Sequence, residues 1–188
     1  MTFHRPPARF QCRCLCLLLC TASATIAMGS PAPGTTIEIY YAPEDAPLDR
    51  LLTLYGQAKQ YIYVAVYGFT SPKAVEALAL AKKRGLDVRL ITDQERMQDP
   101  KQRRAVHTLQ LAGVPVKVGR HDGLMHLKQV VIDDRINTSG SMNHTTSGNR
   151  YNDERLDIVT DHGVSVKARE KFLSMWNDAD RYRPWSEE

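Results

Sequence analysis

The sequence predicts an α/β fold in which a mixed, largely parallel sheet is sandwiched between helices. Strand patterns and helix patterns alternate through the first half of the chain, which is the order that produces parallel strands joined by helices. One segment, YIYVAVYGF at 61–69, is apolar throughout, as expected for a strand covered on both faces. Two further strand patterns lie close together near residue 134, which predicts a hairpin and therefore a mixed sheet.

The first half of the chain begins with the strand pattern TIEIYYA at 36–42, which alternates with a period of two. A helix at 47–59 begins at a proline and places its leucines on one face. After the apolar strand, a second helix covers 72–84, with proline in its first turn and Gly85 at its end. The remaining elements expected in this half are a strand at 86–93, a helix at 100–112 and a short strand at 114–118.

Strand patterns dominate the second half. HLKQVVID at 126–133 and INTSG at 136–140 are expected to pair as a hairpin, and the polar segment 144–152 has the composition of a loop. ERLDIVT at 154–160 predicts another strand, and 163–180 predicts a terminal amphipathic helix.

Residues 1–27 have the pattern of a secretory signal peptide. Three arginines and no acidic residue accompany an apolar run too short to span a bilayer, and small residues follow it. Cleavage is expected after Ala24 or after Ala27. Residues 28–35 predict a flexible leader, which leaves a single domain at 36–188. The mature protein is therefore expected in the periplasm or outside a bacterial cell.

Removing the signal peptide changes what the composition implies. All four cysteines lie within it, so the mature protein has no disulfide and no cysteine-based metal site. The net charge of +4 falls to +1 once the first 24 residues and their three arginines are removed. Charge alone therefore does not indicate a nucleic-acid partner. The basic clusters at 82–84 and 101–104 are either solvated helix ends or local contacts to a phosphate backbone.

The residues best suited to chemistry lie between 126 and 143. His126 and Lys128 are two apart in a predicted strand and therefore point to the same side. An imidazole beside an ammonium suits an anionic substrate: the ammonium neutralises a phosphate while the imidazole attacks it or moves protons. Ser141 and Asn143 follow Gly140 in a turn, where donors can converge on oxyanions.

With Asp133, these residues form the pattern H-x-K-x4-D-x6-G-S-x-N. Six fixed positions at fixed spacings rarely match by chance. The pattern resembles the signature of the phospholipase D superfamily. The chain is most similar to the small, secreted, single-motif members, the endonucleases associated with conjugative plasmids. The similarity extends over nearly all of the mature chain and includes FTSP at 69–72, NDE at 152–154 and FLSMWNDADRY at 172–182.

This resemblance implies a phospholipase D-like catalytic domain and a phosphodiesterase without metal or cofactor. Because the family needs two motifs and this chain has one, it also implies a homodimer that brings two copies of His126 together. One His126 would attack phosphorus to form a phosphohistidine, and the other would protonate the leaving oxygen and then activate water.

The resemblance also assigns roles to the other motif residues. Lys128 and Asn143 would hold the phosphate oxygens with support from Ser141. Glu154 would orient the nucleophilic imidazole. Asp133 and Gly140 would be structural.

Several alternatives remain open from the residues. The substrate class implied is DNA, with RNA as a further candidate, and the alternative is a phospholipase D that hydrolyses phosphatidyl head groups with the same residues. A binding protein with an inactive site is a third class, which the intact motif disfavours. His121, Asp122 and His126 suggest a metal cluster, but no further ligand stands at suitable spacing. His144 stands where the family commonly has Phe, and would either line the pocket or cap the next helix.

Overall fold

The computed structural model describes residues 1–2 and 34–186. Residues 3–27 of the expected signal peptide and 28–33 of the expected leader lie outside the described residues. The strands are β1 (Thr36–Ala42), β2 (Tyr61–Val66), β3 (Asp87–Asp93), β4 (Val116–Gly119), β5 (Lys128–Ile132), β6 (Ile136–Gly140), β7 (Glu154–Thr160) and β8 (Tyr182–Pro184). The helices are α1 (Pro47–Gln57), α2 (Pro72–Lys83), the 3₁₀ helix η1 (Glu95–Gln98), α3 (Pro100–Leu111), α4 (Thr146–Arg150) and α5 (His162–Asn177).

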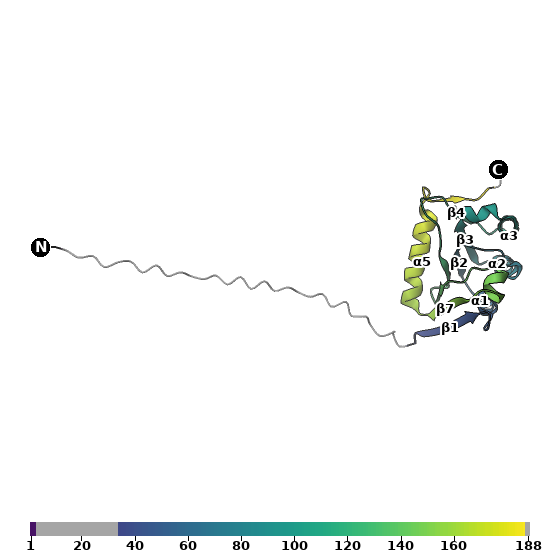
Figure 1. The fold of residues 1–188 in the computed structure, drawn as a ribbon, viewed down its shortest axis with the longest axis horizontal. Coiled ribbons are helices and arrows are strands. Elements are labelled where there is room, and N and C mark those ends of the chain that lie inside the picture. The colour runs from purple at the N-terminus through teal and green to yellow at the C-terminus, as the bar shows by residue number, and fades with distance from the viewer. Residues whose placement is uncertain (3–33, 187–188) are drawn as a thin grey trace. The chain divides into compact units, whose positions relative to one another are not determined.

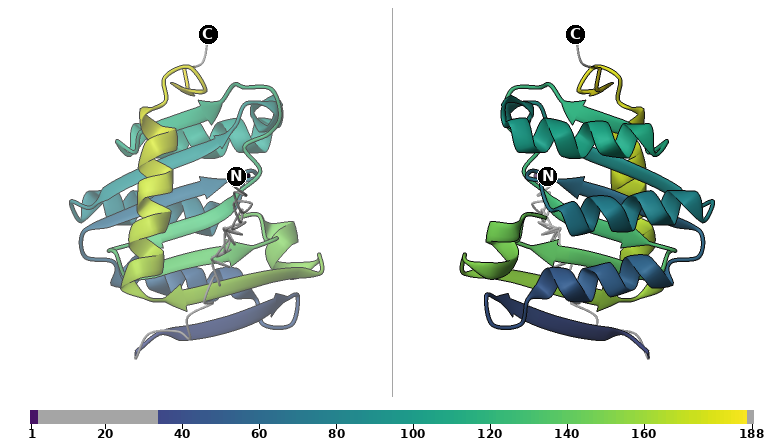
Figure 2. Two further views of the ribbon diagram at one scale, coloured as in Figure 1. Left: turned by 90° about the vertical axis from the view of Figure 1, so that its left-hand side faces the viewer. Right: turned by 90° about the vertical axis from the view of Figure 1, so that its right-hand side faces the viewer.

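The strands form one mixed sheet in the order β1-β7-β6-β5-β2-β3-β4-β8. Helices α1, α2 and α3 cover one face, and α5 crosses the other (Figures 1 and 2). The mixed α/β class and the sandwich of helices are confirmed. The expected hairpin is confirmed by the antiparallel pairing of β5 with β6.

The expectation that the sheet is largely parallel was wrong. Only β2–β3 and β3–β4 are parallel pairs, and the other five neighbouring pairs are antiparallel. The reason is the position of β1, which does not lie beside β2 although a helix connects them. Strands β5, β6 and β7 return as an antiparallel meander between β2 and β1, so β1 pairs with β7 at the edge.

The strand β2 shows why its sequence is apolar throughout. Ile62, Val64 and their alternating neighbours pack in the core under α1, α2 and α3. Tyr61 and Tyr63 belong to the second core, where the Tyr63 ring stacks on Phe172 of α5 at 4.8 Å between centroids. Both faces of β2 are therefore buried, and this strand holds the centre of the sheet.

Three elements were not expected from the sequence. The segment 144–152 contains α4 instead of being a loop throughout, because Thr145 caps the helix by accepting a hydrogen bond from Gly148 N at 2.9 Å. The others are η1 and the short edge strand β8, which pairs with β4. In the described part of the chain, no helix is both long enough and apolar enough to span a bilayer.

Candidate active site

The candidate catalytic residues meet at one end of the central strands of the sheet. His126 lies two residues before the start of β5 and Lys128 begins that strand, while Ser141 directly follows β6 and Glu154 begins β7. Strands β5, β6 and β7 alternate in direction. The start of β5, the end of β6 and the start of β7 therefore lie at the same end of the strands. The fold thus gathers residues separated by up to 28 positions in the sequence.

His126 and Lys128 are in direct contact. The Lys128 ammonium lies 3.0 Å from His126 Nδ1 and 3.1 Å from Nε2, and it donates to the His126 carbonyl oxygen at 2.8 Å. The imidazole is exposed, whereas Lys128 is only 9% exposed. Burial lowers the pKa of Lys128, and the negative charge of Glu154 partly offsets this effect. An exposed imidazole and a buried cation together present an anion-binding surface to solvent.

Tyr67, which the sequence analysis did not single out, forms a wall of this site. Its ring centroid lies 4.8 Å from that of His126, and Lys128 Nζ lies 5.5 Å from it. The residue follows β2 directly, so the end of the central strand positions it. A half-buried tyrosine here restricts the orientations open to the imidazole.

Ser141 and Glu154 form a second part of the site. The Ser141 hydroxyl donates a short hydrogen bond to Glu154 Oε2, and Asn152 Nδ2 donates to Glu154 Oε1 at 3.2 Å. Two bonds between Ser141 and the backbone of Arg155 fix the serine: Ser141 N donates to the Arg155 carbonyl oxygen at 3.0 Å, and Arg155 N donates to Ser141 Oγ at 3.1 Å. Within residues 34–186, Glu154 therefore makes its hydrogen bonds with Ser141 and Asn152, and makes none with His126.

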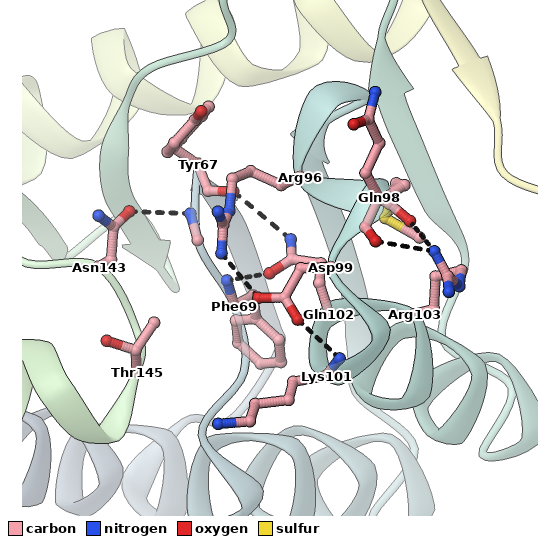
Figure 3. A network of polar contacts seen from close by, with 12 residues as sticks. Tyr67, Phe69, Arg96, Gln98, Asp99, Lys101, Gln102, Arg103, Asn143 and Thr145 are labelled. Atoms are coloured by element: carbon pink, nitrogen blue, oxygen red, sulfur yellow. Dashed lines mark hydrogen bonds and ion pairs between the residues drawn. The ribbon is translucent and has the colours of Figure 1, made fainter.

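Asn143 is oriented by the backbone that follows β2. Gly68 N donates to Asn143 Oδ1 at 2.8 Å, so the Nδ2 end of the amide is the one directed to other partners (Figure 3). A Cβ at residue 68 would lie 3.1 Å from Asn143 Cγ, so any larger residue there would press on the amide. The next residue, His144, donates from its backbone N to the Gly68 carbonyl oxygen at 2.9 Å. These contacts join the segments 68–70 and 143–145 into a short two-stranded bridge.

Gln102 supports this bridge through a hydrogen bond to the backbone of Phe69. Its side chain is fully buried and accepts from Phe69 N at 2.7 Å (Figure 3). It also donates to Thr92 Oγ1 at 2.7 Å. Nε2 also lies 3.4 Å from the Tyr67 carbonyl oxygen. Gln102 therefore fixes the backbone that carries Tyr67 and orients Asn143. In the sequence it appeared only within a basic cluster.

Asp133 and His144 lie apart from the imidazole. Asp133 follows the far end of β5, about 20 Å along the strand from His126. It accepts hydrogen bonds from three successive backbone N–H groups, of residues 59, 60 and 61, at 2.7, 2.8 and 2.9 Å. His144 is buried against Phe69 and does not cap α4, since Thr145 does. Burial lowers the pKa of His144 to about 4.

The open space at the site is limited. A pocket of about 430 Å³ is lined by Ser141, Glu154 and neighbours on β1 and β7, while His126 lies outside it on the surface. Among the residues that the structure describes, no group of three or more His, Cys, Asp or Glu side chains is placed to hold a metal ion.

Comparison with known proteins identifies the family. Residues 51–176 match the family model described as "Cardiolipin synthase, PLD-like domain". The chain belongs to the phospholipase D superfamily. It is 32% identical to the mitochondrial cardiolipin hydrolase of Xenopus tropicalis over 161 residues, which cover 80% of this chain and 75% of the relative. It is 28% identical to the phospholipase D of Rickettsia conorii over 120 residues, covering 64% of this chain and 57% of that one.

A solved phospholipase D family member, Nuc from Salmonella typhimurium, shares the fold with a TM-score of 0.76 and 23% identity, covering 81% of this chain and 99% of that chain. The expected phospholipase D-like fold is thereby confirmed. The family relationship also establishes the general activity: the protein is a phosphodiesterase of this superfamily.

Proposed function

We propose that the protein is a non-specific endonuclease that hydrolyses DNA, with RNA as a further substrate, through a phosphohistidine formed at a site shared by two copies of the chain. The observation that carries this proposal is the pairing of exposed His126 with buried Lys128. The fold of Nuc, which this chain covers almost entirely, supports the resemblance to small single-motif nucleases.

The chemistry follows from the positions of the side chains. The His126 imidazole attacks phosphorus, the bond from phosphorus to the leaving oxygen breaks, and the imidazole of the partner subunit's His126 gives its proton to that oxygen. Water then attacks the phosphohistidine, loses a proton to the second imidazole and releases the phosphate product. Lys128 and Asn143 bind the non-bridging oxygens, so the phosphate charge is balanced without a metal.

The surface around His126 supports the shared site. Leu124 and Leu127, on either side of it in the sequence, are 48% and 39% exposed. Exposed apolar side chains beside a polar site suggest a contact surface. A second copy placed there would cover the leucines and bring a second imidazole to the phosphate. A strictly monomeric enzyme with full activity would contradict this arrangement, and the mass of the active species in solution tests it.

The alternative substrate is a phospholipid. The relatives named cardiolipin hydrolase and phospholipase D favour it, and the same residues would act in the same roles.

We also propose that residues 1–27 direct export to the periplasm or the medium. Determining the N-terminus of the exported protein tests this, with Thr25 or Met28 as the expected first residue.

Cleavage of plasmid DNA by the purified mature protein in excess EDTA, run beside release of choline from phosphatidylcholine, tests the proposed activity. DNA cleavage that EDTA leaves unchanged is the expected result. Intact DNA with release of choline would replace the endonuclease with a phospholipase, and cleavage abolished by EDTA would contradict the metal-independent mechanism.

A further inference from the structure

A pocket of about 730 Å³ lies between α2, α3 and the start of α4, apart from the pocket that Ser141 and Glu154 line. Its volume is that of sites that bind small organic ligands. Thr70 and Thr145 contribute to its wall, and both belong to the two-stranded bridge that orients Asn143. In Figure 3, Lys101 extends beneath Phe69 toward the side where Thr145 and Asn143 lie. The pocket and the candidate active site thus share a wall.

The cations near this pocket divide into two kinds. Arg96 pairs with Asp99 at 3.0 Å, and Arg103 donates to the carbonyl oxygens of Met97 and Gln98 at 2.8 and 3.0 Å (Figure 3). Both guanidinium groups already have hydrogen-bond partners within the protein.

Lys101 and Arg104, by contrast, line the pocket and are exposed. Within residues 34–186, no hydrogen bond or ion pair engages either charged group. Glu76 is the one acidic residue of the lining, so the pocket carries a net positive charge. An anionic ligand complements it.

The rest of the lining is mixed, and apolar atoms form the larger part of its exposed wall. Eight of the twelve lining residues are polar, and they include the hydroxyls of Thr108, Thr146 and Ser147. The apolar part is confined to small side chains such as Val75, Ala79 and Ala105. A nucleotide fits such a mixed wall, because its phosphate complements Lys101 and Arg104 and its base can pack on the apolar atoms.

We propose that this pocket binds a nucleotide of the polynucleotide substrate that flanks the scissile phosphate, with Lys101 and Arg104 on its phosphate. This inference rests on the proposed endonuclease function. The pocket contributes to binding and not to chemistry, because it contains none of the motif residues. Its loss therefore weakens binding of polynucleotides and leaves hydrolysis of a small diester unchanged.

Two variants test the pocket, one through its charge and the other through its volume. Lys101→Gln with Arg104→Gln removes its charge, and Ala79→Phe fills its floor. Lys82→Gln with Lys83→Gln, at the far end of α2, is the matched control for charge. The substrates are a 12-nucleotide single strand and bis(p-nitrophenyl) phosphate, which is small enough to need only the catalytic residues.

Both pocket variants are expected to raise KM for the oligonucleotide about tenfold and to leave kcat/KM for the small diester within about twofold. The charge variant also lowers the slope of log KM against log salt by about 1.4, the value for two phosphate contacts on a single strand. An unchanged oligonucleotide KM in both variants, or an equal rise in the control, would overturn the proposal.

Direct binding separates failure of the pocket from failure of the endonuclease proposal. If the wild type hydrolyses the small diester but no polynucleotide, the endonuclease proposal fails and the pocket is judged by titration with deoxyadenosine 5′-monophosphate followed by NMR. Shifts at Thr145 and Thr146 that Ala79→Phe abolishes support a nucleotide site. No shift, or shifts produced only by short-chain phosphatidylglycerol, overturns it.

Discussion

Gly140 lies so close to Arg155 that a Cβ on residue 140 would stand 2.1 Å from the Arg155 carbonyl oxygen. The same carbonyl accepts the backbone N–H of Ser141, the residue whose hydroxyl donates to Glu154. The glycine of the motif is therefore a packing requirement at the point where β6 delivers Ser141 to the site. Its φ of 139° adds a backbone conformation that other residues rarely adopt.

Gly140→Ala is expected to lower the free energy of unfolding by about 3 kcal/mol or more, because the Cβ forces β6 away from β7. Gly123→Ala is the matched control, since Gly123 also has a positive φ but no atom within 4 Å of an added Cβ. The control should lose about 1 kcal/mol. Urea unfolding measures both, and equal losses would show that backbone conformation alone requires Gly140.

Asp133→Ala is expected to destabilise the protein by about 2 kcal/mol, because three backbone donors lose their acceptor. Asp133→Asn keeps Oδ1, which serves two of the donors, and should lose about half as much. Turnover by the folded protein should be unchanged because of the distance from His126. A thermal melt with an activity assay on each variant tests this, and lost turnover at full stability would assign Asp133 to the chemistry.

His144 is expected to make the protein sensitive to acid. Its pKa is about 4 in the folded state, below its ordinary value of 6.5, because the buried imidazole is kept neutral. Between these values the unfolded chain binds more protons, so stability is complete above pH 6.5 and falls toward pH 4. The loss from this residue at pH 4.5 is about 2–3 kcal/mol.

His144→Phe should remove that part of the acid sensitivity. Urea unfolding at pH 7.5 and pH 4.5 measures the difference, and the exposed His107→Phe serves as the control. The free energy of unfolding falls between pH 7.5 and pH 4.5 in both proteins. The contribution of His144 is the difference between the fall in the wild type and the fall in the variant, since the other titrating groups are common to both. An equal fall in the free energy of unfolding in His144→Phe and the wild type would contradict the role of His144 in acid sensitivity.

Lys128 is expected to set an alkaline limit on turnover. Burial lowers its pKa from the ordinary 10.5, so its charge is lost at a lower pH than that of a surface lysine. If the charged form binds the phosphate, kcat/KM for bis(p-nitrophenyl) phosphate falls with rising pH at a midpoint below 10.5. Lys128→Arg should be less active but lack this fall, because a guanidinium stays protonated. A wild-type profile that is flat to pH 10.5 would contradict the role of Lys128.

The sequence predicted local elements better than their arrangement. The bounds of β1, β6 and β7 are as expected, because period-two patterns and turn residues are local signals. The position of β1 beside β7 is a long-range pairing that no local pattern encodes, and together with the meander of β5, β6 and β7 it makes the sheet mostly antiparallel. The short helix α4 was missed because five residues are too few to show a helical period.

The same limit applies to the candidate site. His126, Lys128 and Ser141 were predicted from a spacing pattern and Glu154 from the family resemblance, and the ends of β5, β6 and β7 bring them together. Tyr67 and Gln102 were not predicted, because a tyrosine ending an apolar run resembles core and a glutamine among basic residues resembles surface. Only tertiary packing shows that one contacts His126 and the other is fully buried.

Turnover of bis(p-nitrophenyl) phosphate by His126→Asn tests the central claim most directly, because this diester requires neither polynucleotide nor lipid recognition. His107→Asn on the exposed face of α3 is the control, and thermal melts confirm that both variants fold. We expect a loss of about 10³-fold or more in kcat for His126→Asn and wild-type activity for the control. Full activity in folded His126→Asn would contradict the phosphohistidine mechanism.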